Sequence, residues 1–549
     1  MARVSRRKPK KALAAELDSR SHEQRGVSKT EVAVWCALIT AAVAALIWRH
    51  CTVFFLSWTD EQIHLYVARR VADGMVLYRD INSSRPPLTI LPVAWLIKLG
   101  FSPLLAGRAM VMVSQLATAG FLLWGGWRLI SWRAGTLAAL LFLTSPEVFD
   151  RFHYTGMQLV VLTTVACVLY FLRSMPFRSG LAFGLILATG QHGLAIGSLV
   201  ALWTVLRRPR DGVRFLLGAL VVGMLVFGSV RLMGGQHVWD SLFGHHLYHL
   251  SSGKNSGDTQ FGERFAPWLY DHAYLIVGLA LSLTLLRSRE KDVARRPLSS
   301  PPSRTVLALL VAAGVHATIV MAMTQAVFLY MVVIAPLLAL LAGTGFDAVA
   351  RWWADSRRGS PSRRRRASRL MLCGIAATLA VACGGWAAAR SHREGLDERK
   401  YAFLPQIRYG ELAWYQRLDV AGRVAEDLAL PKDGTVFGDP TIVSAVALDG
   451  GSRIAGELAD FDYRWLEAGT INHEDVVSRI ETDQVAAMVT SPWFIAQSAY
   501  FRLYIMACYE IPKVFPPPEN GPGSGLFDIL VYRHKLGTYP CHVPSAAPF

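Results

Sequence analysis

The sequence predicts a multi-span α-helical membrane protein that carries a small α/β domain at its C-terminal end. Hydrophobic residues make up 52% of the 549 residues and the mean hydropathy is +0.31, as is typical of integral membrane proteins. Apolar runs of membrane-spanning length recur as far as Ala389, and mixed polar and apolar segments with turn signals follow. The net charge of +17 lies in short basic blocks between the apolar runs, which argues against a nucleic-acid partner.

A helix needs about 20 residues to cross the apolar core of a bilayer. By this measure we expect about eleven transmembrane helices, three of which need flanking residues to span. The candidates are Val32–Leu56, Leu104–Trp127, Ala134–Leu143, Met157–Leu172, Gly180–Gly190, Leu194–Leu206, Phe215–Met233, Ala266–Leu286, Val306–Met323, Ala326–Phe346 and Leu370–Ala389. The run Leu88–Leu99 is shorter and contains Pro92 and Lys98, so we expect a helix at the membrane interface.

Basic blocks predict the orientation, because loops rich in Lys and Arg stay in the cytoplasm. The N-terminal tail is basic from Arg3 to Lys11, and every second connection after it is basic as well. We therefore expect a cytoplasmic tail at residues 1–30, a membrane domain at residues 31–390 with a first external loop at residues 57–87, and an extracytoplasmic α/β domain at residues 391–549. The first apolar run is too long for a signal peptide and lacks a small-x-small cleavage site, which predicts a retained anchor.

Strand and helix patterns alternate in the C-terminal region, which is typical of an α/β domain. Strands are expected at Thr435–Phe437, Ile454–Leu458, Val485–Thr490 and Leu526–Arg533, and helices at Thr441–Ala447, Glu474–Glu481 (capped by Asn472) and Trp493–Tyr509. Cys508 and Cys541 are the only cysteines of this region, and a disulfide between them is one option outside the cytoplasm.

The most specific motif follows the first apolar run. It consists of an acidic pair, a short amphipathic helix, Tyr-x-Asp and Arg-Pro-Pro-Leu: Asp60-Glu61, Ile63–Ala72, Tyr78-Arg79-Asp80 and Arg85-Pro86-Pro87-Leu88. Thr59 and Gln62 fit a capping box, so Asp60 and Glu61 are expected in the first turn of the helix. The helix dipole favours carboxylates there without any catalytic role.

This order resembles the first external loop of the GT-C glycosyltransferases that use polyprenyl-phosphate sugars, a family that includes protein O-mannosyltransferases and the aminoarabinose transferases of lipid A. The segment from Tyr330 to Pro336 is similar to a late span of the same family. The resemblance implies an inverting enzyme of the bacterial inner (plasma) membrane. It would transfer a sugar from a polyprenyl-phosphate donor to a glycan, lipid or protein acceptor on the outer face.

The resemblance also implies roles for the acidic residues. Asp60 would be the base, since the acidic phosphate leaving group needs no general acid. Glu61 would orient the acceptor or help to bind a divalent cation; relatives differ in metal dependence, so Mg²⁺ or Mn²⁺ is an option and no cofactor is certain. A second carboxylate is expected after the third span, where Asp150 is the candidate; a local ion pair with Arg151 is the alternative.

Five further residues are candidates for contact with the substrate: Tyr78, Asp80, Arg85, His153 and His249. Arg85 has the planar fork that suits phosphate oxygens. His249 lies one helical turn after His245, but no carboxylate or Cys stands at a matching spacing, so contact with a lipid phosphate is favoured over zinc. Asp460-Phe461-Asp462 matches the Asp-x-Asp of nucleotide-sugar enzymes, but a turn is the favoured interpretation of this short pattern.

Two other functions stay open. A glycan ligase or polymerase that moves a larger lipid-linked saccharide would centre on a late external loop with Arg and His, and the loop Gly234–Trp268 is a partial match. A transporter or scaffold would show broken helices in paired halves and charges inside the membrane. The sequence shows neither of these clearly, and it contains no internal repeat.

Overall fold

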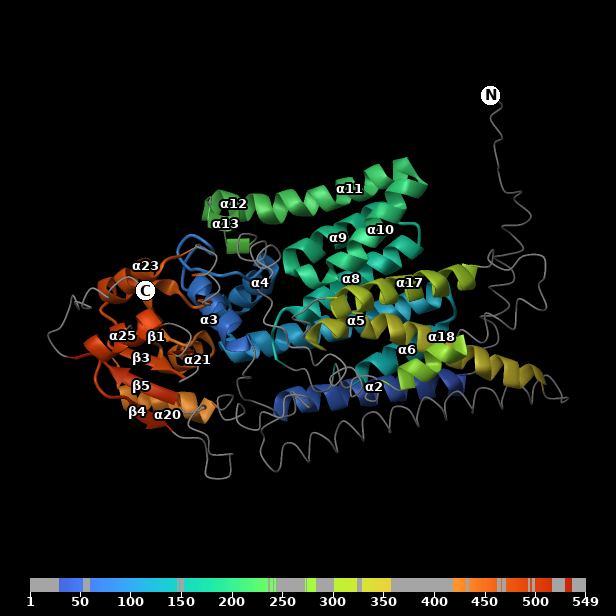
Figure 1. The fold of residues 1–549 in the computed structure, drawn as a ribbon. Coiled ribbons are helices and arrows are strands. Elements are labelled where there is room, and N and C mark those ends of the chain that lie inside the picture. The colour runs from blue at the N-terminus through green and yellow to red at the C-terminus, as the bar shows by residue number, and fades with distance from the viewer. Residues whose placement is uncertain are drawn as a thin grey trace.

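The computed structural model describes the chain in segments: residues 29–52, 60–145, 148, 153–235, 237–239, 241–242, 272, 274–282, 301–322, 328–356, 418–430, 434–461, 466, 471–491, 494–495, 499–515 and 529–535. Long helices form an elongated bundle, and a small α/β unit lies at one end of it (Figure 1). Two shorter helices, α3 (Glu61–Ala72) and α4 (Pro87–Lys98), lie between the bundle and the α/β unit.

The bundle contains a helix at most of the predicted spans. Its elements are α2 (Lys29–Thr52), α5 (Pro103–Leu129), α6 (Trp132–Leu143), α8 (Met157–Leu172), α9 (Pro176–Thr189), α10 (Leu194–Arg207), α11 (Pro209–Gly223) with a π-helical turn at Met224–Gly228, α12 (Ser229–Gly234), α13 (His237–Trp239), α17 (Pro301–Ala322) and α18 (Ala335–Ser356), with 3₁₀ turns at Gln191–Gly193 and Phe328–Val333. A further helical segment covers residues 274–282. The last predicted span, Leu370–Ala389, lies outside the described residues.

Length and composition identify four membrane-crossing helices within the described part of the chain: Lys29–Trp48, Pro103–Leu129, Pro209–Gly234 and Met331–Ala350. The helices at Trp132–Leu143 and Met157–Leu172 are apolar but shorter. The predicted total of about eleven spans therefore stays a prediction. On the outer side of α11, large apolar side chains such as Leu216, Leu217 and Leu220 are exposed, as is expected of a surface that faces lipid.

Glycine permits the close crossing of α9 and α11. A Cβ atom on Gly180 would lie 1.9 Å from the carbonyl oxygen of Phe215, and one on Gly218 would lie 2.2 Å from that of Phe177. Any larger residue at either position would push the two backbones apart. Small residues at such crossings are common in membrane bundles, where helix association depends on van der Waals packing.

Helix α3 begins one residue later than the capping-box pattern predicted. Its N-cap is Asp60, so Asp60 lies before the first turn and Glu61 occupies its first position. The Asp60 side chain makes no capping hydrogen bond, and Thr59 lies outside the described residues. The predicted short helix at Leu88–Leu99 is present as α4, where Pro86 is the N-cap and Pro87 the first residue, a position that proline tolerates.

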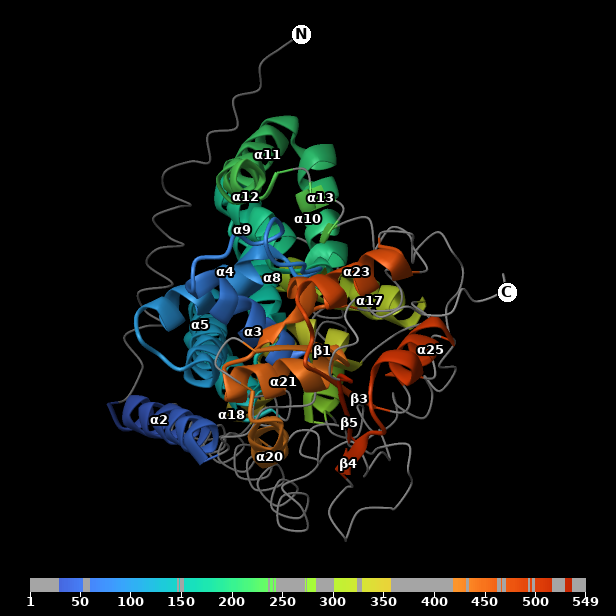
Figure 2. The same ribbon diagram turned by 90° about the vertical axis from the view of Figure 1, so that its left-hand side faces the viewer.

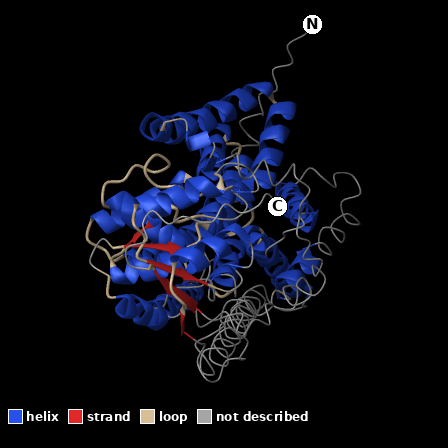
Figure 3. Ribbon diagram, turned by 60° about the vertical axis from the view of Figure 1, so that its left-hand side comes forward, coloured by secondary structure: helices blue, strands red, loops and turns tan. Residues whose placement is uncertain are grey.

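The C-terminal unit contains a five-stranded sheet in the order β2-β1-β3-β5-β4 (Figure 3). Strand β1 runs parallel to β2 and β3, whereas β5 runs antiparallel to β3 and β4. The strands are β1 (Thr435–Gly438), β2 (Arg453–Ile454), β3 (Ala487–Thr490), β4 (Lys513–Phe515) and β5 (Ile529–Arg533); the helices are α20 (Leu418–Leu428), α21 (Pro440–Gly450), α23 (His473–Thr482) and α25 (Ala499–Cys508).

Most of the predicted elements of this unit are present, and one differs. The predicted strand Ile454–Leu458 ends at Ile454, because Gly456 and Glu457 both adopt positive φ, 55° and 51°, and the chain turns. Asn472 caps α23 as predicted and accepts a hydrogen bond from the Asp475 amide at 2.7 Å. Cys508 is disulfide-bonded, and its predicted partner Cys541 lies outside the described residues.

One apolar core joins the first-loop helices to the α/β unit. Ile63, Leu65 and Val67 of α3 are buried in the same cluster as Val443 and Val446 of α21. Viewed from the α/β end of the molecule, α3 and α21 lie next to each other (Figure 2). The bundle has a separate core around α6, α8 and α18, and the far side of the sheet packs around Phe437 and Phe501. The α/β unit is thus packed onto the first loop.

Candidate functional site

The candidate site is centred on Arg85, which lies between two carboxylates. Its Nη1 donates to Oδ2 of Asp60 at 2.9 Å, and its Nη2 donates to Oδ1 of Asp460 at 3.1 Å. Asp60 stands at the start of α3, whereas Asp460 follows the turn after β2 in the α/β unit. The site therefore lies at the junction of the first loop and the C-terminal unit.

The two carboxylates differ in exposure and in anchoring. The side chain of Asp60 is 48% exposed and that of Asp460 is 7% exposed. Oδ2 of Asp460 also accepts hydrogen bonds from the Ser84 amide at 2.8 Å and from the Ser84 hydroxyl at 2.5 Å. Asp460 is therefore a fixed group, and Asp60 is open to solvent or substrate.

The carboxylates raise the pKa of Arg85 above its ordinary value. Burial alone would lower the pKa, but the charges of Asp460 and Asp60 and their hydrogen bonds outweigh that effect. The guanidinium thus stays charged, and its buried Nε–H has no partner among the described residues.

His64 supports Asp60 from within α3. Its Nδ1 lies 2.7 Å from the carbonyl oxygen of Asp60, which is consistent with an Nδ1–H donor. Burial and then the charge of Arg85 lower the pKa of His64 to about 4, so the ring is neutral at physiological pH. The rings of His64 and Tyr154 pack edge to face, with their centroids 5.8 Å apart.

Glu61 is fully buried and faces away from solvent. Its Oε2 accepts a hydrogen bond from Nη2 of Arg108 at 3.0 Å, and its Oε1 accepts one from the Tyr154 amide at 2.8 Å. Arg108 lies in α5 and is 3% exposed. These contacts tie α3 to the bundle and to the loop before α8. They support a role for Glu61 in holding the site, rather than direct contact with an acceptor.

Tyr78 and Asp80 shape the loop that carries Arg85. The Tyr78 hydroxyl donates to the Arg85 carbonyl oxygen at 2.5 Å, and Tyr78 has a φ of 70°, which is rare for a residue other than glycine. Asp80 accepts a hydrogen bond from the Val76 amide at 2.9 Å and pairs with Arg79. The hydrogen bond from the Arg79 side chain, and then that from Val76, lower the pKa of Asp80 to about 2. Both residues thus act on the loop backbone.

Of the other predicted residues, His153 lines a small cavity, and two lie outside the described part. His153 is buried and lines a cavity of about 20 Å³ together with Gln115, Thr118 and Gln158. A cavity of this size holds about one water molecule. Asp150 and His249 lie outside the described residues. The structure thus brings Asp60 and Arg85 into contact, and Tyr78 holds the Arg85 backbone.

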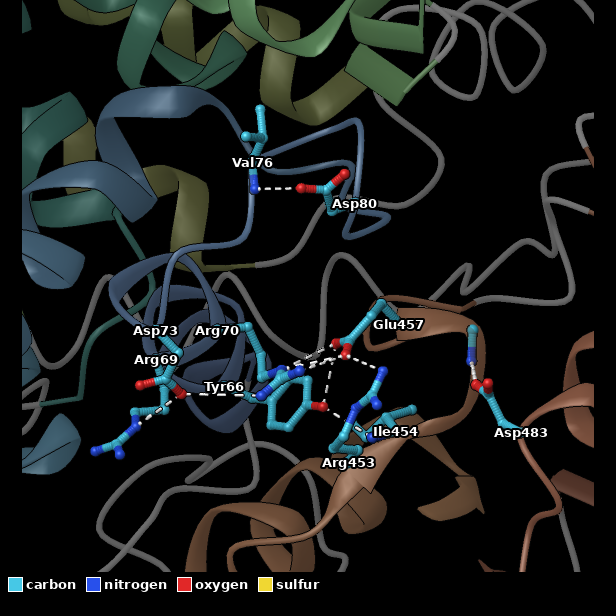
Figure 4. A network of polar contacts seen from close by, with 11 residues as sticks. Tyr66, Arg69, Arg70, Asp73, Val76, Asp80, Arg453, Ile454, Glu457 and Asp483 are labelled. Atoms are coloured by element: carbon cyan, nitrogen blue, oxygen red, sulfur yellow. Dashed lines mark hydrogen bonds and ion pairs between the residues drawn. The ribbon is translucent and has the colours of Figure 1, made fainter. Parts of the chain in front are cut away.

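A second ion-pair network lies beside the site and fastens α3 to the α/β unit (Figure 4). Glu457, which is 5% exposed at the side chain, accepts hydrogen bonds from Nη2 of Arg70 at 2.8 Å and from the Tyr66 hydroxyl at 3.3 Å. The Tyr66 hydroxyl itself accepts from the Ile454 amide at 2.8 Å. Glu457 reaches this network from the positive-φ turn that ends β2, three residues before Asp460.

The residues around Arg85 do not form a divalent cation site as they stand. The guanidinium lies between the carboxylates of Asp60 and Asp460 and already pairs with both. No group of three or more His, Cys, Asp or Glu side chains in the described segments is arranged to hold a metal ion. The described residues around Arg85 therefore do not by themselves fit a bound Mg²⁺ or Mn²⁺ ion.

Sequence reasoning missed the residues that link distant segments. Asp460 lies in a turn, as the interpretation of Asp460-Phe461-Asp462 predicted, but its pairing with Arg85 was not anticipated. Glu457 was expected in a strand. Arg108 carried a usable signal, because a charged residue inside the predicted span Leu104–Trp127 needs a partner.

Comparison of structures finds proteins similar to this chain, whereas comparison of sequences finds none. No family model matches the chain, and no curated protein matches it. ArnT from Cupriavidus metallidurans in the apo state superposes with a TM-score of 0.57 at 15% identity, covering 91% of this chain and 97% of that one. The chain shares the fold of ArnT.

A second structure of ArnT, bound to undecaprenyl phosphate, gives a TM-score of 0.55 at 16% identity over 91% of this chain and 98% of that one. An oligosaccharyltransferase from Archaeoglobus fulgidus, AglB, reaches a TM-score of 0.49 at 10% identity over 93% of this chain and 75% of that one. This score is too low to establish a shared fold. The ArnT similarity confirms the GT-C-like membrane fold that the first-loop motif predicted.

Proposed function

We propose that this protein is an inverting glycosyltransferase that moves a sugar from a polyprenyl-phosphate donor to a glycan, lipid or protein acceptor on the outer face of the membrane. The contact between Asp60 and Arg85 supports this proposal most directly. It joins an exposed carboxylate to a charged guanidinium at the end of a membrane bundle, on a fold shared with ArnT. One of the two ArnT structures has undecaprenyl phosphate bound.

Transfer needs one base and one anion-binding group. Asp60 takes the proton of the acceptor hydroxyl as its oxygen attacks the anomeric carbon. The bond from that carbon to the phosphate oxygen breaks, and its electron pair leaves with the polyprenyl phosphate. Arg85 binds the phosphate and stabilises the charge that develops on it. Attack opposite the leaving group inverts the anomeric configuration.

The other predicted residues fill supporting roles in this proposal. Tyr78 and Asp80 hold the loop that positions Arg85, and Glu61 holds α3 on the bundle through Arg108. We further propose that Asp150 orients the acceptor and that His153 and His249 contact the substrate. We also propose that the N-terminus is cytoplasmic and that the chain is divided into a tail (residues 1–30), a membrane domain (residues 31–390) and an extracytoplasmic domain (residues 391–549).

A transfer assay with the full-length protein tests the proposal. Protein reconstituted in nanodiscs with an undecaprenyl-phosphate sugar should release undecaprenyl phosphate when the acceptor is supplied. Arg85→Gln should abolish this release, whereas Arg79→Gln, an exposed arginine of the same loop, should retain it.

The acceptor is found by mass spectrometry of envelope glycans and glycolipids from cells with and without the gene. Loss of one sugar residue supports the proposal. Loss of a whole polymer would instead favour a ligase or polymerase, and unchanged glycans together with inactive protein would reject transfer altogether.

A further inference from the structure

Among the described residues, Arg85 and the two carboxylates that pair with it carry a summed charge of −1. An anionic phosphate cannot bind favourably while both carboxylates hold the arginine. One of them has to give up its place on the guanidinium. The exposed Asp60 is the exchangeable partner, because Asp460 is buried and also holds both the amide and the hydroxyl of Ser84.

Asp460 weakens the hold of Arg85 on any other anion. A second carboxylate on one guanidinium reduces the attraction that remains for the first, and the same holds for a phosphate. Sharing the charge thus lets Asp60 leave Arg85 more readily when the donor phosphate binds, and it leaves the polyprenyl phosphate product easier to release.

The α/β unit fixes Asp460 in this position. The Arg70–Glu457 ion pair and the Tyr66–Ile454 hydrogen bond hold the preceding turn against α3 (Figure 4). Glu457 adopts a φ of 51°, a conformation that costs free energy and persists only where the surroundings enforce it. The strained turn is held by the Arg70–Glu457 ion pair and the Tyr66–Ile454 hydrogen bond, and it therefore fixes the position of the Asp460 carboxylate.

We propose that Asp460 is a positioning residue of the transferase site, carried by the α/β unit, which shares the charge of Arg85 so that Asp60 and the donor phosphate exchange on it. This inference rests on the proposed function. It assigns the C-terminal unit a direct part in setting the affinity for the lipid phosphate and in releasing Asp60 from Arg85.

Binding of undecaprenyl phosphate to the full-length protein in nanodiscs tests the inference. Asp460→Asn should bind this probe about tenfold more tightly, the lower end of the effect of a close charge, because Arg85 is partly exposed. The kcat should fall while KM also falls, since the polyprenyl phosphate product leaves more slowly. Asp460→Glu should bring affinity and kcat back toward the wild-type values.

Matched variants separate this effect from structural damage. Asp427→Asn removes a carboxylate from the same unit where it pairs with Lys513 and Arg533, and it should leave the affinity unchanged. Glu457→Gln loosens the docking without removing a partner of Arg85, and it should lower the thermal stability without tightening binding. Asp460→Ser can be used if the Asn variant fails to accumulate, because its hydroxyl still accepts from Ser84.

Failure of the proposed function and failure of the charge-sharing role would give different binding results. If wild-type protein shows no saturable binding of undecaprenyl phosphate, the proposed function itself is wrong. If wild-type protein binds, Arg85→Gln does not, and Asp460→Asn binds with wild-type or weaker affinity, only the charge-sharing role is rejected.

Discussion

Asp460 lies 375 positions after Arg85 in the chain, yet its carboxylate accepts a hydrogen bond from the Arg85 guanidinium at 3.1 Å. The contact joins the first loop to the sheet of the C-terminal unit at the point where Asp60 also meets Arg85. The arrangement of these side chains leads to predictions about catalysis, stability and topology.

Asp60→Asn should lower transfer by about 10²–10⁴-fold, the usual contribution of a general base. The protein should accumulate normally, because Asp60 is about half exposed and makes no capping hydrogen bond. Asp73→Asn is the matched control: it alters an exposed carboxylate at the other end of α3 that pairs with Arg69. Wild-type transfer by Asp60→Asn would reject the assignment of the base.

Glu61→Ala should mainly destabilise the protein. It leaves the Arg108 guanidinium without the buried carboxylate that now pairs with it, and breaking a buried ion pair costs about 3–5 kcal/mol. Thermal unfolding in detergent measures the effect. The double variant Glu61→Ala/Arg108→Ala should lose less stability than the sum of the single variants, because it leaves no unpaired charge. A normal melting temperature with lost activity would instead point to a role in substrate or metal binding.

Acidification should destabilise the first loop through His64. The folded-state pKa is about 4 and the ordinary value is 6.5, so the unfolded chain binds a proton more readily between these two values. Stability from this group is therefore complete above pH 6.5 and declines as the pH falls toward 4, by up to about 1.4 kcal/mol per pH unit. Unfolding free energies at pH 7 and pH 5 give the slope. His64→Gln should flatten it, and an equal slope in that variant would exclude His64 as the cause.

Impermeant maleimide labelling tests the orientation. In a background without other reactive cysteines, Ile511→Cys in the α/β unit should label from outside intact cells, since Ile511 is 92% exposed. Arg210→Cys, at the exposed connection between α10 and α11, should label only after the membrane is permeabilised. The opposite pattern would invert the topology and place the candidate site in the cytoplasm.

Local patterns predicted the elements of this protein better than their mutual contacts. The α4 run, the Asn472 cap and the strand at Val485–Thr490 followed from spacing and capping residues that act over a few positions. The end of β2 was missed because the positive φ of Glu457 is imposed by Arg70 and Tyr66, which no local pattern reveals.

The candidate site shows the same difference between local patterns, which the sequence reveals, and tertiary contacts, which it does not. Asp60 and Arg85 stood out because they lie 25 positions apart within one motif. Asp460 and Arg108 complete their surroundings from other parts of the chain, and only tertiary packing brings them there. The family resemblance identified the motif but gave no information about the C-terminal unit.

The core that joins α3 to α21 has a consequence for biosynthesis. A ribosome that adds about 5–20 residues per second needs roughly 20–75 s to proceed from Arg85 to Asp460. During this interval the apolar side of α3 lacks its contacts with α21, and Arg70 and Arg85 lack the carboxylates of Glu457 and Asp460. The first loop therefore reaches its final arrangement only after Asp460 has been translated, so the site is completed well after the loop itself has been made.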